Sequence, residues 1–371
     1  MRRMSPSPRL ALPPPPPRVW MLAFLPVVGA LAVLAPERQV PLFACACAAI
    51  VPLAAWMGRA TEQLAERLGE GLGGLLNATL GNAAELIIGL AALRHGLVDI
   101  VKASLIGSIL GNLLLVLGAA VLAGGMRRDT QSFNVTAARS QSSMLTLAAI
   151  SLLAPAAFQA MGGRGAASRG LSSAIALVLI ATYACGLLFS LRTHRRLFLG
   201  AGCRASEVEP RPAAFVPWSS RRSLAVLAAA AAATAWLSDL LAGVVEPAAR
   251  QLGMSNLFVG VVVLAIVGNA AEHASAVQVA RRDRMDLALG ITLGSSVQVA
   301  LLVAPLLVLL SPFVGPRPMD LVFSGAEVLA VAGAVVIAGQ VAGDGESNWL
   351  EGAQLLAVYA VLAALFFYLP G

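Results

Sequence analysis

Long apolar stretches separated by short polar connections run through almost the whole chain. A helix that spans the hydrocarbon core of a membrane needs about 20 mostly apolar residues, with a range of about 17–25. About eleven stretches fit this rule, at 19–35, 40–57, 72–93, 97–123, 135–160, 171–191, 224–245, 257–279, 287–310, 321–341 and 350–369. The pattern therefore predicts an all-α polytopic membrane protein with about eleven transmembrane helices.

The composition agrees with this fold class. The sequence is 58% hydrophobic and only 12% charged, which excludes an ordinary soluble domain of 371 residues. The net charge is +7, and most of the 26 basic residues fall in alternate connections, which places those connections in the cytoplasm. We therefore expect a cytoplasmic N-terminus, a bacterial inner (plasma) membrane, the lipid bilayer as a partner and no nucleic acid. The four cysteines lack the spacing of a disulfide framework or a zinc site.

One polar connection, 59–70, has leucines four residues apart and charges on its other faces. This pattern is typical of a short amphipathic helix at the membrane surface. Its glutamates, Glu62, Glu66 and Glu70, have two interpretations. They form either a simple solvated face or a group that attracts cytoplasmic cations.

A five-residue motif that occurs twice divides the chain into halves. Gly-Asn-Ala-Ala-Glu occupies 81–85 and returns at 268–272, which is 187 residues later. A Gly-Ser pair follows each glutamate at the same distance, at 107–108 and 294–295. With one extra helix at the start, each half holds five helices, and an odd repeat inserts its second copy upside down. The predicted organisation is a disordered basic, proline-rich N-terminus at 1–18, an extra transmembrane helix at 19–36, a first repeat at 37–192, a cytoplasmic loop at 193–222 and a second repeat at 223–371.

A carboxylate inside a membrane-length apolar segment is costly, so Glu85 and Glu272 predict an ion or proton pathway. We expect them to face each other near the bilayer midplane, across the pseudo-twofold axis of the repeat. Burial and a neighbouring carboxylate favour the protonated form of such groups, whereas a divalent cation favours the ionised form. Protons and a cation therefore exclude each other, which is the basis of antiport. Asp239 and Glu327 lie nearer the ends of their stretches and are candidate acids of an access path.

The residues around the two glutamates supply further oxygen ligands. Gly81 and Gly268 are predicted to break their helices and free backbone carbonyls, while Asn82 and Asn269 offer side-chain amides. Each downstream helix adds a pair of polar residues on one face, namely Ser108 with Asn112, and Ser295 with Gln298. Such a set suits a hard cation such as Ca²⁺, which takes about 6–8 oxygens. His273 has two open interpretations, a hydrogen bond in helix packing or a direct part in transport.

These motifs resemble those of the Ca²⁺:H⁺ antiporter family of cation/proton exchangers, within the wider cation/Ca²⁺ exchanger superfamily. The resemblance rests on Asn-Ala-Thr-Leu-Gly-Asn-Ala-Ala-Glu-Leu-Ile-Ile at 77–88, Gly-Ser-Ile-Leu-Gly-Asn-Leu-Leu-Leu-Val-Leu-Gly at 107–118, Gly-Asn-Ala-Ala-Glu-His at 268–273, Gly-Ser-Ser-Val-Gln-Val at 294–299 and Ser-Asn-Trp-Leu-Glu-Gly at 347–352. It implies an extra N-terminal helix followed by two inverted five-helix repeats. It also implies Glu85 and Glu272 as the exchange carboxylates, and His273 as a feature of the proton-coupled branch. Many relatives carry an acidic helix in the central loop, and this chain does not.

The predicted function is a secondary active antiporter that exchanges cytoplasmic Ca²⁺ for H⁺ by alternating access and needs no cofactor. The alternatives on the same fold are Na⁺/Ca²⁺, Na⁺(K⁺)/H⁺ or Mn²⁺/H⁺ exchange. The sequence contains no P-loop motif, so we expect transport without ATP. An intramembrane enzyme is disfavoured, because none of the three histidines has the spacing of His-Glu-x-x-His. A passive channel is disfavoured by the repeat, which is the plan of carriers.

Overall fold

The computed structural model describes residues 19–194, 197 and 218–369. The predicted N-terminal segment 1–18 lies outside the described residues, as does most of the predicted loop 193–222. The first half of the chain comprises η1 (Val19–Ala23), α1 (Phe24–Leu34), α2 (Gln39–Leu80), α3 (Ala83–Arg94), α4 (Val98–Leu110), η2 (Gly111–Val116), α5 (Leu117–Gly125), α6 (Val135–Ala160), α7 (Ala166–Leu188) and η3 (Phe189–Thr193). The second half comprises α10 (Ser220–Gln251), α11 (Asn256–Phe258), η4 (Val259–Leu264), α12 (Ala265–Arg281), α13 (Met285–Gln298), η5 (Val299–Val303), α14 (Ala304–Val314), α15 (Gly325–Val341) and α16 (Trp349–Tyr368).

The helices match the predicted apolar stretches. In the described residues, nine helical segments are long and apolar enough to cross a membrane, and two shorter apolar helices lie at Trp20–Leu34 and Gly325–Val341. Each of these coincides with one stretch of the sequence pattern, which confirms the predicted all-α membrane fold. The only strands described are β1 (Gln131–Ser132) and β2 (Glu346–Ser347), an antiparallel pair that joins the α5–α6 and α15–α16 connections.

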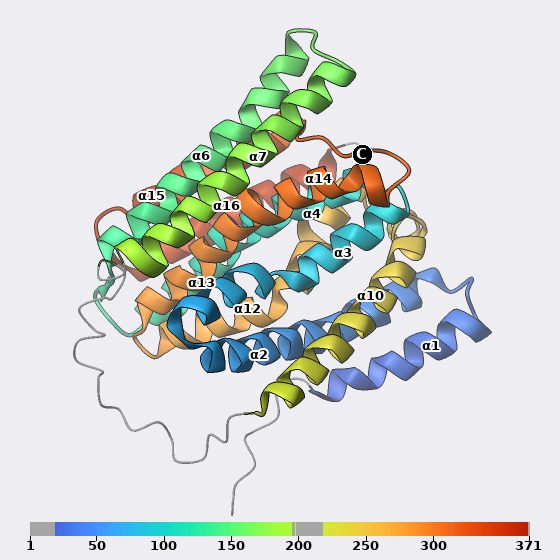
Figure 1. Cartoon of the computed structure of the whole chain (residues 1–371), viewed down its shortest axis with the longest axis horizontal. Helices are drawn as coiled ribbons and strands as arrows, with labels where there is room; N and C mark the ends of the chain where they lie inside the picture. The colour runs from blue at the N-terminus through green and yellow to red at the C-terminus, as the bar shows by residue number, and fades with distance from the viewer. Residues whose placement is uncertain (1–18, 195–196, 198–217, 370–371) are drawn as a thin grey trace, which may run out of the picture.

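The predicted separate surface helix at 59–70 is not separate, because α2 continues through it to Leu80. The helix also folds back on itself, since a Cβ added to Gly73 would collide with the backbone of Ala65. In a straight helix, residues eight apart lie about 12 Å from each other. Figure 1 shows α2 turning back in this region and leading into α3. The segment α2 thus carries the second apolar stretch before this turn and the beginning of the third after it.

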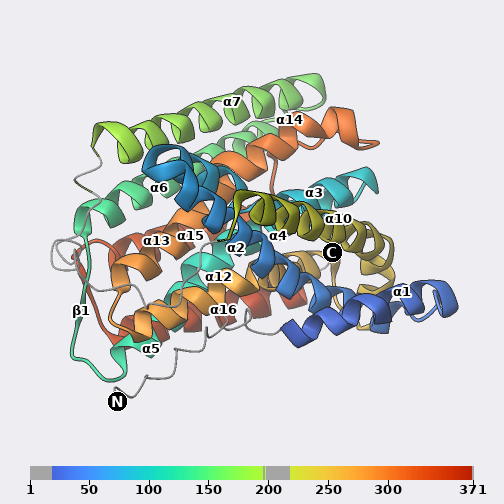
Figure 2. The ribbon, with the colours of Figure 1, turned by 60° about the horizontal axis from the view of Figure 1, so that its bottom comes forward.

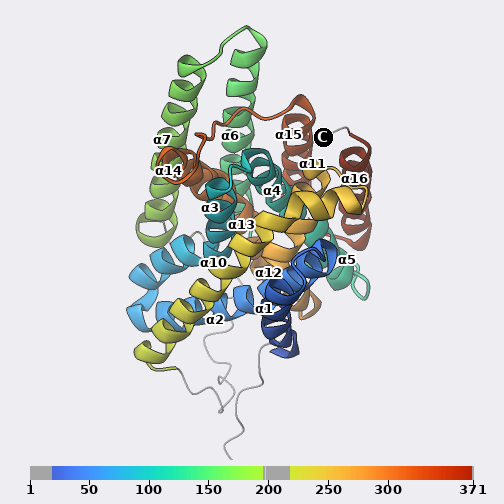
Figure 3. The same ribbon diagram turned by 90° about the vertical axis from the view of Figure 1, so that its right-hand side faces the viewer.

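The helices form two groups with separate cores. A smaller cluster of buried apolar side chains lies mainly between α1, α2 and α10, with single residues of α3 and α4 and two of η4, and a larger one joins most of the remaining helices. Figures 2 and 3 show α6 and α7 along the edge of the molecule opposite α1, with α3, α4, α12 and α13 between them. The site residues predicted from the two motifs lie on these central helices.

Two π-helical segments occur at matching places in the repeats. The segment η2 (Gly111–Val116) follows Ser108, and η5 (Val299–Val303) follows Ser295. Single π-helical turns inside α-helices are rare and are frequently found at functional sites. The repeat that is visible in the sequence is therefore also present in the irregularities of the backbone.

Candidate ion-binding site

Glu85 is placed by a break in the helix of the first half. The long helix α2 ends at Leu80, Gly81 and Asn82 form a turn, and α3 begins at Ala83, so Glu85 lies in the first turn of α3. The amide of Gly81 still donates to the carbonyl of Asn77 at 2.8 Å. A helix N-terminus carries unpaired amide groups and a positive end of the dipole, which stabilise a carboxylate. The structure thus has the break that the sequence predicts at Gly81.

The predicted break at Gly268 is wrong, because α12 runs without interruption from Ala265 to Arg281. The irregularity lies just before it, in the π-helical segment η4. The side chain of Asn269 donates to the carbonyl of Ala265 at 3.0 Å, within its own helix, and to Oγ of Ser108 at 3.1 Å. The two motifs share a sequence but not a backbone conformation, because the second asparagine is held by its own helix and by α4.

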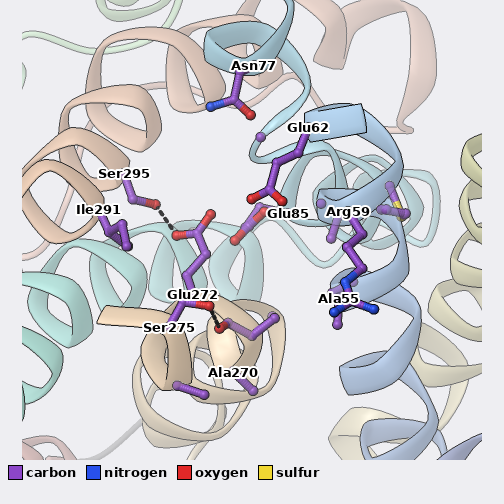
Figure 4. Close-up of a pocket in the computed structure, with 18 of the residues that line it drawn as sticks. Ala55, Arg59, Glu62, Asn77, Glu85, Ala270, Glu272, Ser275, Ile291 and Ser295 are labelled. Carbon is purple, nitrogen blue, oxygen red and sulfur yellow. Dashed lines mark hydrogen bonds between the residues drawn. The ribbon is translucent and has the colours of Figure 1, made fainter. Parts of the chain in front are cut away.

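The structure brings Glu85 and Glu272 to one place. A Cβ added to Gly268, one turn before Glu272, would lie 3.9 Å from Cγ of Glu85, so α3 and α12 pass closely at the two motifs. Ser295 on α13 donates its hydroxyl to Oε2 of Glu272 at 2.6 Å. Figure 4 shows both carboxylates directed into the same cavity. Two acids from opposite halves therefore share one polar site.

The cavity has a volume of about 740 Å³ and is enclosed by α2, α3, α12 and α13. Its lining includes both glutamates, Ser295 and Gln298. It also includes polar residues that the sequence interpretation did not place in the site, namely Arg59, Asn77, Ser275, Gln278 and Asp286. The lining extends to the exposed residues Glu62, Gln278 and Asp286, so the cavity opens at that end.

Four of the predicted ligands lie outside the cavity lining. Asn82, Ser108, Asn112 and Asn269 are all buried. Both polar atoms of the Asn82 side chain, Nδ2 of Asn112 and Oδ1 of Asn269 have no hydrogen-bond partner among the described residues. A buried polar atom without a partner costs about 1–3 kcal/mol, so such atoms indicate a place for an ion or water. The unpaired oxygens of Asn82 and Asn269 are therefore candidate cation ligands.

The other predicted candidates are placed elsewhere. His273 is half-buried and is not part of the lining. Asp239 lies 2.9 Å from Nε2 of His95, and Glu327 closes a capping box with Ser324 at the start of α15. Neither Asp239 nor Glu327 lines this cavity, so their role in an access path stays a prediction. Two cues in the sequence pointed to the residues that do line it, since Ser275 lies one turn after Glu272, and Asp286 follows Asp99 by the repeat distance.

Comparisons with known proteins identify the family of the chain. A profile of the family described as "Sodium/calcium exchanger protein" matches residues 39–192 and 222–368. The chain is 45% identical to the Ca(2+)/H(+) antiporter of Synechocystis sp., covering 90% of this chain and 92% of the relative. It is 46% identical to the Ca(2+)/H(+) antiporter ChaA of Bacillus subtilis, covering 88% of this chain and 92% of the relative.

Solved structures show the same fold. The structure of native YfkE superposes with a TM-score of 0.80 at 40% identity, covering 94% of this chain and 98% of that one. The H⁺/Ca²⁺ exchanger CAX superposes with a TM-score of 0.72 at 16% identity, covering 94% of this chain and 90% of that one. At that identity the second likeness concerns the fold alone.

Proposed function

The chain belongs to the sodium/calcium exchanger protein family, and from this premise we propose that it is an antiporter that exchanges Ca²⁺ for H⁺. Its relatives in Synechocystis and Bacillus carry the name of this activity and are matched over about nine tenths of their length. The membrane is then the plasma membrane of a bacterium, with the N-terminus in the cytoplasm. The observation that carries the proposal is the convergence of Glu85 and Glu272 on one cavity.

In this proposal, the two carboxylates hold either one Ca²⁺ or protons. Ca²⁺ takes about 6–8 oxygens, and two carboxylates alone do not fill that shell. The hydroxyl of Ser295 and the amide oxygen of Gln298 lie in the same cavity, and the unpaired oxygens of Asn82 and Asn269 lie just outside its lining. Ser108 orients Asn269, because Asn269 donates to its hydroxyl, and Asn112 is a further candidate ligand on the helix that follows Ser108. A proton on either carboxylate removes charge and a lone pair from the cation, so the two substrates exclude each other.

We further infer that the molecule works by alternating access, because matched faces of the two repeats differ in burial. On α13, Leu287 is 44% exposed and lines the cavity, whereas its counterpart Ile100 on α4 is 3% exposed. Gly290 on α13 is exposed and lines the cavity, whereas its counterpart Ala103 is buried. One half is therefore open where the other is closed.

The helices α2 and α10 repeat this difference. Val51, Ala55 and Gly58 on α2 line the cavity. Their counterparts 187 residues later are buried on α10, at Ser238, Ala242 and Val245. With the predicted orientation, this structure is open to the cytoplasm. Exchanging the conformations of the two repeats would close that path and open an equivalent path to the other side.

Everted membrane vesicles test the proposal. The cytoplasmic face of everted vesicles is outside, so an imposed interior-acid pH gradient should drive Ca²⁺ uptake in the absence of ATP. Glu85→Gln and Glu272→Gln should each abolish it, because each removes a charged cation ligand. Replacing the proton gradient by a Na⁺ or K⁺ gradient, and Ca²⁺ by Mn²⁺, distinguishes the other exchange reactions of this fold. Uptake that persists in both glutamine variants would contradict the site.

A further inference from the structure

We propose that Glu62 captures the cation at the cytoplasmic mouth of the cavity, and that this capture exists on that side only. The inference rests on the proposed function, which supplies the cation and the side. It concerns the step before Ca²⁺ reaches Glu85 and Glu272. The expected consequence is a difference in apparent Ca²⁺ affinity between the two faces of the membrane.

Glu62 is the exposed acid of the α2 wall. The cavity face of α2 carries Val51, Ala55 and Gly58 and then, nearer the mouth, Arg59 and Glu62. Glu62 is exposed, and Figure 4 shows its carboxylate directed into the cavity towards the two glutamates. Glu66, one turn further along the same helix, is also exposed but does not line the cavity. The position of Glu62 thus differs from that of an ordinary solvated glutamate.

The charges of the lining favour a cation at the mouth. Four acids, Glu62, Glu85, Glu272 and Asp286, line the cavity together with Arg59. Asp286 accepts a hydrogen bond from the backbone amide of Asn134 at 2.6 Å, so one of its oxygens is already engaged. A cleft lined mainly by one sign of charge concentrates the opposite ion and speeds its association. Of these four acids, Glu62 is the one on α2, at the mouth where a cation enters from the cytoplasm.

The other half has no carboxylate at the position that matches Glu62. The residue equivalent to Glu62 in the second half, 187 positions later, is Ala249, and Ala249 is 1% exposed. The residue equivalent to Arg59 is Glu246, so the sign of the charge at this position differs between the two halves. Glu246 accepts a hydrogen bond from Nδ2 of Asn256 at 3.4 Å. The central carboxylates obey the repeat, as do Asp99 and Asp286, whereas Glu62 and Arg59 do not.

A residue that only concentrates the cation changes the apparent KM and leaves the maximal rate almost unchanged. Removing its charge should raise the KM by about threefold to tenfold, because one exposed charge contributes no more than the low end of the roughly tenfold to thousandfold range of charge-steered association. The effect should shrink as ionic strength rises, because salt screens exposed charges. Arg59 carries the opposite charge at the same mouth, so Arg59→Gln should shift the KM in the opposite direction.

The test measures initial rates of pH-driven Ca²⁺ transport against Ca²⁺ concentration, in everted and in right-side-out vesicles. Glu62→Gln should raise the KM about threefold to tenfold in everted vesicles and leave it unchanged in right-side-out vesicles. Glu66→Gln, the matched control on the same helix, should change neither. Glu62→Asp keeps the charge and should stay near the wild type, which separates charge from folding.

Several results would overturn the inference. These are an unchanged KM in Glu62→Gln, an equal shift in Glu66→Gln, a shift on both faces, or a loss of maximal rate alone. A wild-type protein that shows no pH-driven Ca²⁺ transport would overturn the proposed function, and with it this inference. If the wild type transports Ca²⁺ and Glu62→Gln has the same KM as the wild type, the role of Glu62 is overturned while the proposed function stands.

Discussion

Gly268 of the second motif packs against Glu85 of the first, since a Cβ added to Gly268 would lie 3.9 Å from Cγ of Glu85. The first motif has a related contact, because a Cβ added to Gly81 would lie 3.3 Å from Oε1 of Gln298. The glycine of each motif therefore faces a polar side chain of the other half. The repeated sequence creates one site because each copy leaves room for a ligand supplied by the other.

This contact predicts that Ca²⁺ transport falls as the residue that replaces Gly268 becomes larger. A Cβ has only ordinary van der Waals contacts at this position, so Gly268→Ala should fold and retain most Ca²⁺ transport. Gly268→Leu places a branched side chain where Glu85 lies and should reduce transport by about tenfold or more through misplacement of that ligand. Both variants are compared by Ca²⁺ uptake in everted vesicles, normalised to folded protein. Equal activity of the two variants would show that Glu85 does not need this position.

Ser295 is predicted to be a working member of the site rather than a packing residue. Its hydroxyl donates to Glu272 at 2.6 Å, and bonds to charged groups contribute about 1.5–3 kcal/mol. Ser295→Ala should therefore weaken Ca²⁺ binding by roughly tenfold to a hundredfold, while Ser295→Thr should keep most of it. Calorimetric titration of the purified protein measures this.

The neighbouring serine provides the control for that prediction. Ser296 is also buried, but its hydroxyl donates to the carbonyl of Thr292 in its own helix at 2.9 Å. Ser296→Ala should leave Ca²⁺ binding unchanged. The assignment fails if both alanine variants bind Ca²⁺ equally well.

The two matched asparagines should respond differently to substitution. Both polar atoms of the Asn82 side chain lack a partner among the described residues, whereas Asn269 donates to Ser108 and Ala265. Asn82→Leu should keep or raise the thermal stability, because no hydrogen bond is lost, and should still weaken Ca²⁺ binding. Asn269→Leu should lower the stability by about 1 kcal/mol for each hydrogen bond lost. Thermal unfolding without Ca²⁺, together with Ca²⁺ titration, tests both. A large loss of stability in Asn82→Leu would show that its role is structural.

Competition at the carboxylates fixes the sign of the pH dependence. Because protons and Ca²⁺ bind the same groups, lowering the pH on the Ca²⁺-binding face should weaken apparent Ca²⁺ binding. Each displaced proton contributes a factor of about ten per pH unit in the range where the carboxylates are protonated. The wild type should therefore show a slope of up to about two, and Glu85→Gln a slope of about one or less. Ca²⁺ titrations at a series of pH values measure the slope, and equal slopes would contradict the shared site.

Much of the fold was predictable, because each apolar stretch long enough to span a membrane became a helix. The pairing of Glu85 with Glu272 was also predictable, since the repeat with Gly-Asn and the cost of a buried charge both point to one site. The break at Gly268 was predicted wrongly. Propensity favours a break there, but Asn269 bonds to its own helix and the π-helical segment η4 absorbs the irregularity.

The sequence was a poorer guide to which side chains line the cavity. Asp239 seemed a candidate because it lies in an apolar stretch, yet it pairs with His95 at the end of α3. The sequence left two interpretations of Glu62, a solvated face or the attraction of cations, and did not single out Asp286, yet both line the cavity. The difference arises from the fold-back of α2 and the crossing of α12 and α13. Hydrophobic periodicity within one segment does not predict such packing between segments.

Proton release on Ca²⁺ binding tests the central claim most directly. Purified protein in weakly buffered detergent solution is titrated with Ca²⁺ while the pH is followed. The account predicts proton release that saturates with Ca²⁺ binding and is absent, together with binding, in the Glu85→Gln/Glu272→Gln double variant. Saturable Ca²⁺ binding without release of protons across the pH range of transport would contradict it.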